Sequence, residues 1–290
     1  MADRQQSKRV IIHVGAHKTG TSLVQKYMRD KPEQINPLGI HAISRSDMNT
    51  YVGWGRKIVE HPEEFASRVK RELNNEAVNS IIASHENTLG RPLVAGRTGL
   101  YPRALGNLKG LYNAIGEFDV TIVLSIRPQV AFLQSYYLQL IHEGNHYTFS
   151  EWMAQIDTAN LSWSAVAQNI RDVFGSQALV IVDFQEIRNG QEAYLNYFFQ
   201  CITPGLNLQP QYRPIRNPSI SEKGLNIALA ANPFLNSREE RRKMRRFLQK
   251  NFSNLHYPRP NLMSDVNVEQ LTQLYDAEYR ELIATSNRSI

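Results

Sequence analysis

The fold is decided by the stretch Arg9-Val10-Ile11-Ile12-His13-Val14-Gly15-Ala16-His17-Lys18-Thr19-Gly20-Thr21-Ser22. An apolar run typical of a buried strand leads into a short loop that carries two glycines, one lysine and three hydroxyl side chains. The following residues, Leu23 to Asp30, have the pattern of a helix. Glycines allow a ligand to approach the backbone closely, and the N–H groups of a first helical turn point toward it. This strand–loop–helix order therefore predicts a binding site for a phosphate-like anion.

The lysine of this loop is displaced from the position that it has in nucleotide triphosphatases. Their P-loop follows G-x-x-x-x-G-K-[ST], in which the lysine directly precedes a magnesium-binding hydroxyl. Gly15 and Gly20 keep the glycine separation and Ser22 keeps the hydroxyl. Thr21 takes the place of the lysine, which lies at Lys18 instead. The loop can cradle a phosphate, but it lacks the usual contacts to a γ-phosphate and its metal ion.

The run from His13 to Ser22 resembles the 5′-phosphosulfate-binding loop of sulfotransferases, and in particular of the bacterial branch related to carbohydrate sulfotransferases. This resemblance implies a P-loop-like α/β fold. It also implies that the sulfuryl donor is 3′-phosphoadenosine 5′-phosphosulfate (PAPS), used without a metal ion. On the matching positions it implies that the donor contacts His17, Lys18, Thr19, Gly20, Thr21 and Ser22.

The composition is that of an ordinary soluble globular protein. The 290 residues are 42% hydrophobic and 21% charged, and we expect a single domain over residues 1–290. The only cysteine, Cys201, rules out an internal disulfide and favours a reducing compartment. The first eight residues are polar, and no apolar run has the length that spans a bilayer. We therefore expect a cytoplasmic protein without a transmembrane segment.

A net charge of +6 favours anionic partners. The sequence contains no zinc-finger spacing, helix-turn-helix signature or RNA-recognition motif, so nucleic acid is not an expected partner. The densest charged run, Arg238 to Arg246, is expected to form the solvated face of a helix. The alternative is a rim that attracts an anionic glycan or a lipid headgroup.

Apolar runs typical of buried strands alternate with helical segments along the chain. This alternation predicts a parallel sheet covered on both faces, that is, an α/β three-layer sandwich. The expected strands cover residues 9–14, 39–44, 80–84, 120–126 and 178–182. Helices are expected over 62–76, 191–199, 221–231, 237–252 and 268–284, which makes the portion from about residue 190 helical.

Candidate functional residues follow the ends of these strands. In open α/β sheets, ligands bind beyond the carboxyl ends of the strands. The residues at those ends are the loop with Lys18, then His85 and Glu86, then Arg127, and finally Asp183. We expect Asp183 to cap the following turn rather than to bind a metal ion, because the loop lacks the P-loop lysine.

A second phosphate site is predicted around Arg127. Pro128 is suited to the first position of a helix, and Ser135 follows eight residues after Arg127, about 12 Å along a helix. The segment resembles the 3′-phosphate-binding motif of the same family, an arginine and a serine at this separation. Together with the loop it would hold both ends of a bisphosphorylated nucleotide. Arg216 lies in a segment that resembles one flanking the donor, and it is a further expected donor contact.

Sulfuryl transfer requires a base for the acceptor and neutralisation of charge on the leaving phosphate. Lys18 is expected to neutralise that charge. Related sulfotransferases use a glutamate or a histidine as the base, and the stretch from Ile81 to Glu86 resembles the strand end of the bacterial branch. We expect Glu86 to be the catalytic base, with His85 as the second candidate.

The sequence therefore predicts a PAPS-dependent sulfotransferase that acts on a hydroxyl of a glycan or glycolipid-type acceptor. One alternative is a small-molecule kinase that uses ATP and Mg²⁺, although such an enzyme needs a lysine before Ser22. The other is a non-catalytic nucleotide- or glycan-binding protein that has kept the fold.

Overall fold

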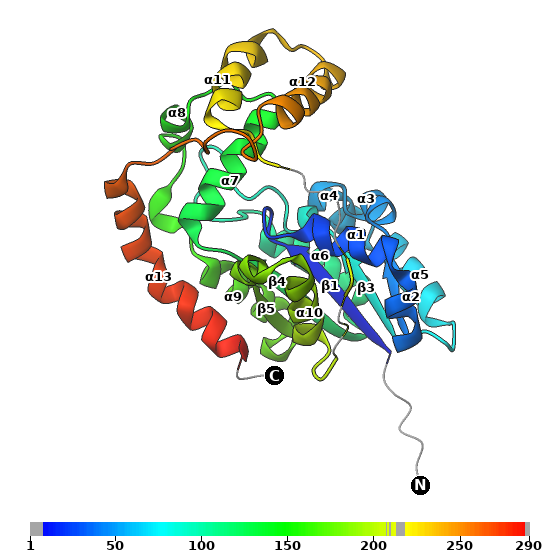
Figure 1. Ribbon diagram of the computed structural model, residues 1–290. Helices are drawn as coiled ribbons and strands as arrows, with labels where there is room; N and C mark the ends of the chain where they lie inside the picture. Colours follow the sequence, from blue (N-terminus) through cyan, green and yellow to red (C-terminus); the bar gives the residue numbers. More distant parts are fainter. Residues whose placement is uncertain (1–7, 207, 209, 213–217, 288–290) are drawn as a thin grey trace. The chain divides into compact units, whose positions relative to one another are not determined.

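The computed structural model describes residues 8–206, 208, 210–212 and 218–287 (Figure 1). The chain divides into two compact units. The larger unit consists of Met1–Arg127, Ser162–Pro214 and Glu278–Ile290, and the smaller unit consists of Pro128–Leu161 and Ile215–Ala277. A single domain over residues 1–290 remains a prediction.

The larger unit is built on a parallel sheet that has five strands among the described residues. The strands are β1 (Arg9–Gly15), β2 (Ile40–Ile43), β3 (Ser80–Ser84), β4 (Asp119–Ile126) and β5 (Leu179–Asp183). Their order is β2-β3-β1-β4-β5, so β1 lies at the centre and its Ile11 is paired with Ile82 of β3 and Thr121 of β4. The five predicted strands are confirmed, with ends that differ by at most one residue.

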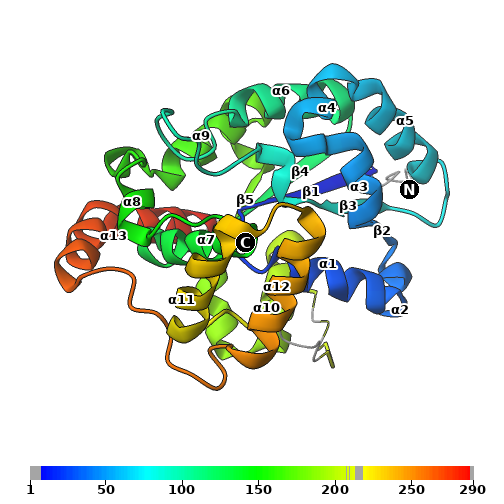
Figure 2. The same cartoon turned by 90° about the horizontal axis from the view of Figure 1, so that it is seen from above.

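Helices cover both faces of this sheet, as Figure 2 shows. On one face lie α1 (Thr21–Asp30), α2 (Pro32–Ile35) and α10 (Gln191–Ile202). On the other lie α3 (Arg45–Val52), α5 (Pro62–Leu73) and α9 (Trp163–Phe174), with α4 (Arg56–Glu60) and α6 (Ala104–Ile115) packed against them. The predicted α/β three-layer sandwich is confirmed.

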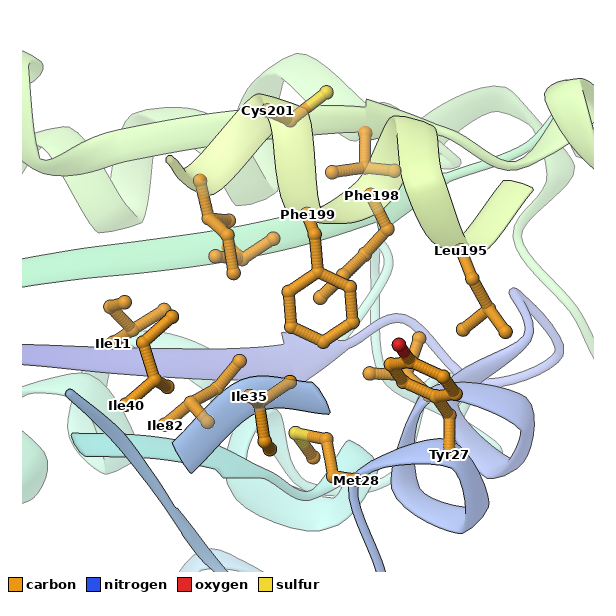
Figure 3. Close-up of a cluster of buried hydrophobic side chains, with 14 of the residues drawn as sticks. Ile11, Tyr27, Met28, Ile35, Ile40, Ile82, Leu195, Phe198, Phe199 and Cys201 are labelled. Atoms are coloured by element: carbon orange, nitrogen blue, oxygen red, sulfur yellow. The ribbon is translucent and has the colours of Figure 1, made fainter. Parts of the chain in front are cut away.

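One hydrophobic core lies between the sheet and the helices α1, α2 and α10 (Figure 3). Phe199 of α10 is fully buried, and its ring lies 5.6 Å from that of Tyr27 and 5.4 Å from that of Phe198. Ile11 comes from the central strand, so this core attaches α1 to the sheet next to the loop of residues 16–20, which we call the anion loop after its predicted ligand. Burial raises the pKa of the Cys201 thiol to about 11, and the thiol therefore stays protonated at neutral pH.

The smaller unit is helical. It contains α7 (Gln129–His142), α8 (Phe149–Met153), α11 (Glu222–Ala231) and α12 (Arg238–Asn251), together with the first part of α13 (Asp265–Asn287), which continues into the larger unit. Pro128 is the N-cap of α7 with an extended ψ of 137°, so the expectation that it occupies the first helical position is wrong by one residue. No helix of the described ranges has the length and apolar character needed to cross a membrane.

The basic run forms α12, whose N-terminus is capped by Ser237 and Glu240 in a capping box. Its buried side chain is Leu248, while Arg242, Lys243 and Arg246 are exposed. The expected solvated helix face is confirmed for these residues.

Leu195 and Leu105 provide a matched test of the core. Leu195 is fully buried in the cluster beneath the sheet, whereas Leu105 on α6 is 40% exposed. Leu195→Ala should lower the free energy of unfolding by about 2–5 kcal/mol, because it removes buried methyl groups and leaves a cavity. Leu105→Ala should cost about 1 kcal/mol or less. Urea denaturation measures both, and equal losses would contradict this placement of the core.

Candidate active site

The loop between β1 and α1 is held in shape by hydrogen bonds from its own threonine side chains. The hydroxyls of Thr19 and Thr21 both donate hydrogen bonds to the carbonyl of Ala16, at 2.6 and 3.2 Å, and both side chains are buried. The hydroxyl of Tyr194 donates to the carbonyl of Thr19 at 3.1 Å. Ser22, in contrast, is exposed. The two threonine hydroxyls therefore stabilise the loop, and only their backbone N–H groups are left for a ligand.

Four consecutive backbone N–H groups, just before and at the start of α1, have no acceptor in the described part of the chain. They belong to Thr19, Gly20, Thr21 and Ser22. The N-terminus of a helix carries partial positive charge, and its first N–H groups are donors for an anion. This row of donors lies where the sequence predicts an anion cradle, and the binding of an anion there remains a prediction.

Gly20 allows the loop to turn at this point. Its φ of +79° is in the left-handed region, which favours glycine. A Cβ atom here would lie 2.8 Å from the ring of Phe184 and 3.2 Å from that of Tyr194. The turn therefore packs against two aromatic rings that leave no room for a side chain.

Lys18 is itself in the left-handed conformation, with a φ of 62°. For a residue other than glycine, this backbone conformation costs about 1–3 kcal/mol and is characteristic of functional sites. The carbonyl of Lys18 accepts a hydrogen bond of 2.9 Å from Nη1 of Arg127. An arginine from the end of β4 thus holds the lysine of the loop in its strained conformation.

Arg127 lies against the loop, as predicted from its position at the end of a strand. Its guanidinium stacks 5.3 Å from the ring of Phe184, and the indole N–H of Trp163 donates to its carbonyl at 2.8 Å. Burial lowers the pKa of Arg127 to about 10, so the group stays cationic at neutral pH. Its Nε has no hydrogen-bond partner among the described residues. The Nε–H group of Arg127 could therefore donate a hydrogen bond to a ligand.

Two other predicted donor contacts are located differently. Ser135 is half-buried on α7 in the smaller unit, and its pairing with Arg127 remains a prediction. Arg216 lies outside the described residues.

Glu86, the preferred base, follows β3 and begins a short 3₁₀ helix, η3 (Glu86–Leu89). Its Oε1 accepts a 2.6 Å hydrogen bond from Nη2 of Arg45, and its Oε2 accepts one of 3.2 Å from Nε2 of Gln25. Burial by itself raises the pKa of this carboxyl, but the charge of Arg45 and hydrogen bonding hold it below its ordinary value. Glu86 is therefore an ionised carboxylate at neutral pH.

His85 is fully buried beside it. Its Nε2 lies 2.7 Å from Oδ1 of Asn49, an acceptor, so this nitrogen carries the proton. The other nitrogen, Nδ1, has no partner in the described structure. Burial lowers the pKa of His85 to about 4, so the imidazole is neutral and Nδ1 presents an unshared electron pair.

His17 belongs to a hydrogen-bond network within the loop. The hydroxyl of Tyr101 accepts from the backbone N–H of His17 at 2.8 Å and lies 3.1 Å from its Nδ1. Nε2 lies 3.0 Å from Oδ1 of Asn87. Burial lowers the pKa of His17 to about 4, so the imidazole is neutral. Both ring nitrogens are thus engaged inside the protein, which makes His17 a support of the loop in this structure.

Several site residues carry no signal in the sequence. Arg45 and Asn49 on α3, and Asn87 and Tyr101 after β3, have no motif around them, although each contacts a predicted residue. The expectation that Asp183 caps the following turn is confirmed, because its carboxylate accepts a hydrogen bond from the N–H of Gln185.

No known protein family and no curated protein matches this chain. Among solved structures, the chain is similar to the crystal structure of a sulfotransferase from Alicyclobacillus acidocaldarius. The TM-score is 0.43 at 14% sequence identity, and the match covers 77% of this chain and 91% of that chain. A similarity this distant establishes neither a family nor an activity.

Among the described residues, no cluster of three or more His, Cys, Asp or Glu side chains could hold a metal ion.

The pairing of Glu86 with Arg45 predicts a specific pH response. A carboxyl whose pKa is lowered in the folded state stabilises the fold at neutral pH, and this contribution is lost as the pH falls through the folded-state pKa. Arg45→Ala removes the largest of the effects that oppose burial at Glu86. The pKa of Glu86 should then rise relative to the wild-type protein, and acid unfolding should begin at a higher pH.

NMR titration of ¹³C-labelled glutamate measures this pKa directly. The control is Arg56→Ala, which removes an exposed guanidinium paired with Glu60 and should leave Glu86 unaffected. An unchanged Glu86 pKa in Arg45→Ala would show that the ion pair does not set it.

Proposed function

We propose that this protein is a sulfotransferase that transfers the sulfuryl group of PAPS to a hydroxyl of a glycan or glycolipid-type acceptor. The observation that supports this most directly is the loop at the start of α1. It offers four N–H groups that have no partner in the described part of the chain and the lysine Lys18, while Thr21 occupies the position of the P-loop lysine. Such a cradle suits a 5′-phosphosulfate held without a metal ion.

The residues of the loop have distinct roles in this proposal. The backbone N–H groups of Thr19, Gly20 and Thr21, together with the exposed hydroxyl of Ser22, bind the 5′-phosphosulfate. Lys18 neutralises the charge that develops on the leaving phosphate. His17 positions the loop through its bonds to Tyr101 and Asn87.

The 3′-phosphate of the donor is bound by Arg127 with Ser135, and Arg216 is a further donor contact. Arg127 supports this role because it is cationic, adjoins the loop and keeps Nε free of partners among the described residues. Its hydrogen bond to Lys18 gives it a second task, which is to hold the loop in shape.

The reaction forms a bond between the acceptor oxygen and sulfur and breaks the bond between sulfur and the bridging phosphate oxygen. The proton of the acceptor hydroxyl passes to the base, and adenosine 3′,5′-bisphosphate (PAP) leaves. Glu86 serves as the base because it is ionised at neutral pH, and its carboxylate oxygens have lone pairs in addition to those that accept from Arg45 and Gln25. His85 is the second candidate because its Nδ1 is unprotonated and unpartnered within the described structure.

The first test concerns PAP binding and Lys18. PAP should bind the wild-type protein in calorimetry without added magnesium, and PAPS with a panel of glycans should yield PAP. Lys18→Ala should reduce turnover about 10²–10³-fold, because it removes a charge from the reacting phosphate. Lys26→Ala, a lysine elsewhere on α1, is the matched control and should leave turnover nearly unchanged.

The absence of PAP binding would refute the proposal. ATP binding that depends on magnesium and shows no preference for a 3′-phosphate would favour the kinase instead. PAP binding without turnover on any acceptor would favour a non-catalytic binding protein.

The second test separates the two tasks of Arg127. Arg127→Ala should weaken the binding of PAP much more than that of adenosine 5′-monophosphate, which lacks the 3′-phosphate. A hydrogen bond to a charged group contributes about 1.5–3 kcal/mol, so the difference should be about tenfold or more. Equal losses for both nucleotides in calorimetry would limit Arg127 to supporting the loop.

A further inference from the structure

An exposed tryptophan lies beside the anion loop. Trp54 occupies the middle of a short turn, η2 (Gly53–Gly55), and is 49% exposed. The other two tryptophans, Trp152 and Trp163, are buried. A large aromatic side chain held in solvent next to a candidate active site forgoes the stabilisation that burial would give it.

The backbone of Trp54 is strained, and the strain lies at the loop. Among the described residues, Lys18, Trp54 and Tyr101 are the non-glycine residues with positive φ. All three adjoin His17: Lys18 follows it in sequence, Tyr101 bonds to it at 2.8 Å, and the Trp54 ring lies nearly parallel to its imidazole at 14° and 6.3 Å. Conformations of this kind cluster at functional sites.

The turn that carries Trp54 is fixed rather than loose. Both flanking glycines have positive φ, 47° at Gly53 and 81° at Gly55. A Cβ on Gly55 would lie 1.9 Å from the side-chain nitrogen of Asn107, a buried residue of α6. The backbone of the turn is thus pressed against α6, which holds the indole in a defined position.

Two arginines flank the same turn. The guanidinium carbon of Arg91 lies 5.5 Å from the centre of the Trp54 ring. A Cβ built on the neighbouring Gly90 would lie 3.8 Å from both the Cβ of Arg103 and the carbonyl oxygen of Trp54. Both arginines are exposed, and neither forms an ion pair with a carboxylate in the described part of the chain.

We propose that Trp54, Arg91 and Arg103 form an acceptor subsite, the Trp54 patch, for a sugar ring that carries a carboxylate. The indole provides a flat apolar surface for the C–H face of the ring, and a guanidinium matches a carboxylate with two parallel hydrogen bonds. The sugar also supplies the hydroxyl that the reaction requires. The role of this patch as an acceptor subsite rests on the proposed function, whereas its binding of the sugar does not.

The test uses a pair of disaccharides that differ by one carboxylate, cellobiouronic acid and cellobiose. Because Trp54 is exposed and the other tryptophans are buried, its fluorescence reports on the patch. Cellobiouronic acid should change this emission saturably and should bind about tenfold or more tightly than cellobiose in calorimetry. Arg91→Ala should remove that preference, and Trp54→Ala should weaken both sugars while Trp54→Phe restores part of the affinity.

Arg56→Ala is the charge control, since it removes an exposed guanidinium two residues from Trp54 and should leave both affinities unchanged. Equal affinities for the two sugars, no change in emission at millimolar sugar, or the same loss in Arg56→Ala as in Arg91→Ala would each overturn the subsite.

The same preparations keep this inference distinct from the proposed reaction. If cellobiouronic acid binds with the expected dependence on Arg91 while PAP does not bind, the subsite stands and the sulfotransferase proposal fails. PAP binding that is unchanged in Arg91→Ala would show that the donor site is intact in that variant.

Discussion

The loop between β1 and α1 has several carbonyl groups paired inside the protein, while the N–H groups of residues 19–22 have no acceptor in the described part of the chain. Thr19 and Thr21 satisfy the carbonyl of Ala16, Arg127 satisfies that of Lys18, and Tyr194 satisfies that of Thr19. The carbonyls of Lys18 and Thr19 belong to the same peptide units as the N–H groups of Thr19 and Gly20, so pairing these carbonyls leaves two unpaired donors beside the start of a helix. The sheet, α10 and the aromatic rings beneath the loop maintain this one-sided arrangement.

The buried histidines around the loop are uncharged at neutral pH, and their hydrogen bonds hold neighbouring segments in position. His13 lies between the hydroxyls of Ser84 and Ser125 at 2.9 and 3.0 Å, and so connects β1 to the strands on either side. Burial lowers its pKa to about 4, as it does for His17 and His85. Positive charge at this edge of the sheet therefore comes from lysine and arginine, which keep it at any physiological pH.

The sequence predicted the sheet and the edge at which the candidate site residues lie, because buried parallel strands appear as apolar runs and their carboxyl ends meet at one edge. It missed α6 and α9, and α6 contains two glycines, which disfavour a helix. It could not predict that the hydroxyls of Thr19 and Thr21 turn inward, since a loop sequence does not fix the direction of a hydroxyl. The ion pair of Glu86 with Arg45 joins residues 41 positions apart that only the fold brings together.

The burial of Cys201 has a practical consequence. It is the chain's only cysteine, it lies in the core beneath the sheet, and its thiol stays protonated at neutral pH. A protonated, buried thiol reacts slowly with alkylating reagents, because the thiolate is the nucleophile. We therefore expect thiol-reactive labels to modify Cys201 only slowly in the native protein. A fluorophore or spin label attached to one introduced surface cysteine would then report on that position alone.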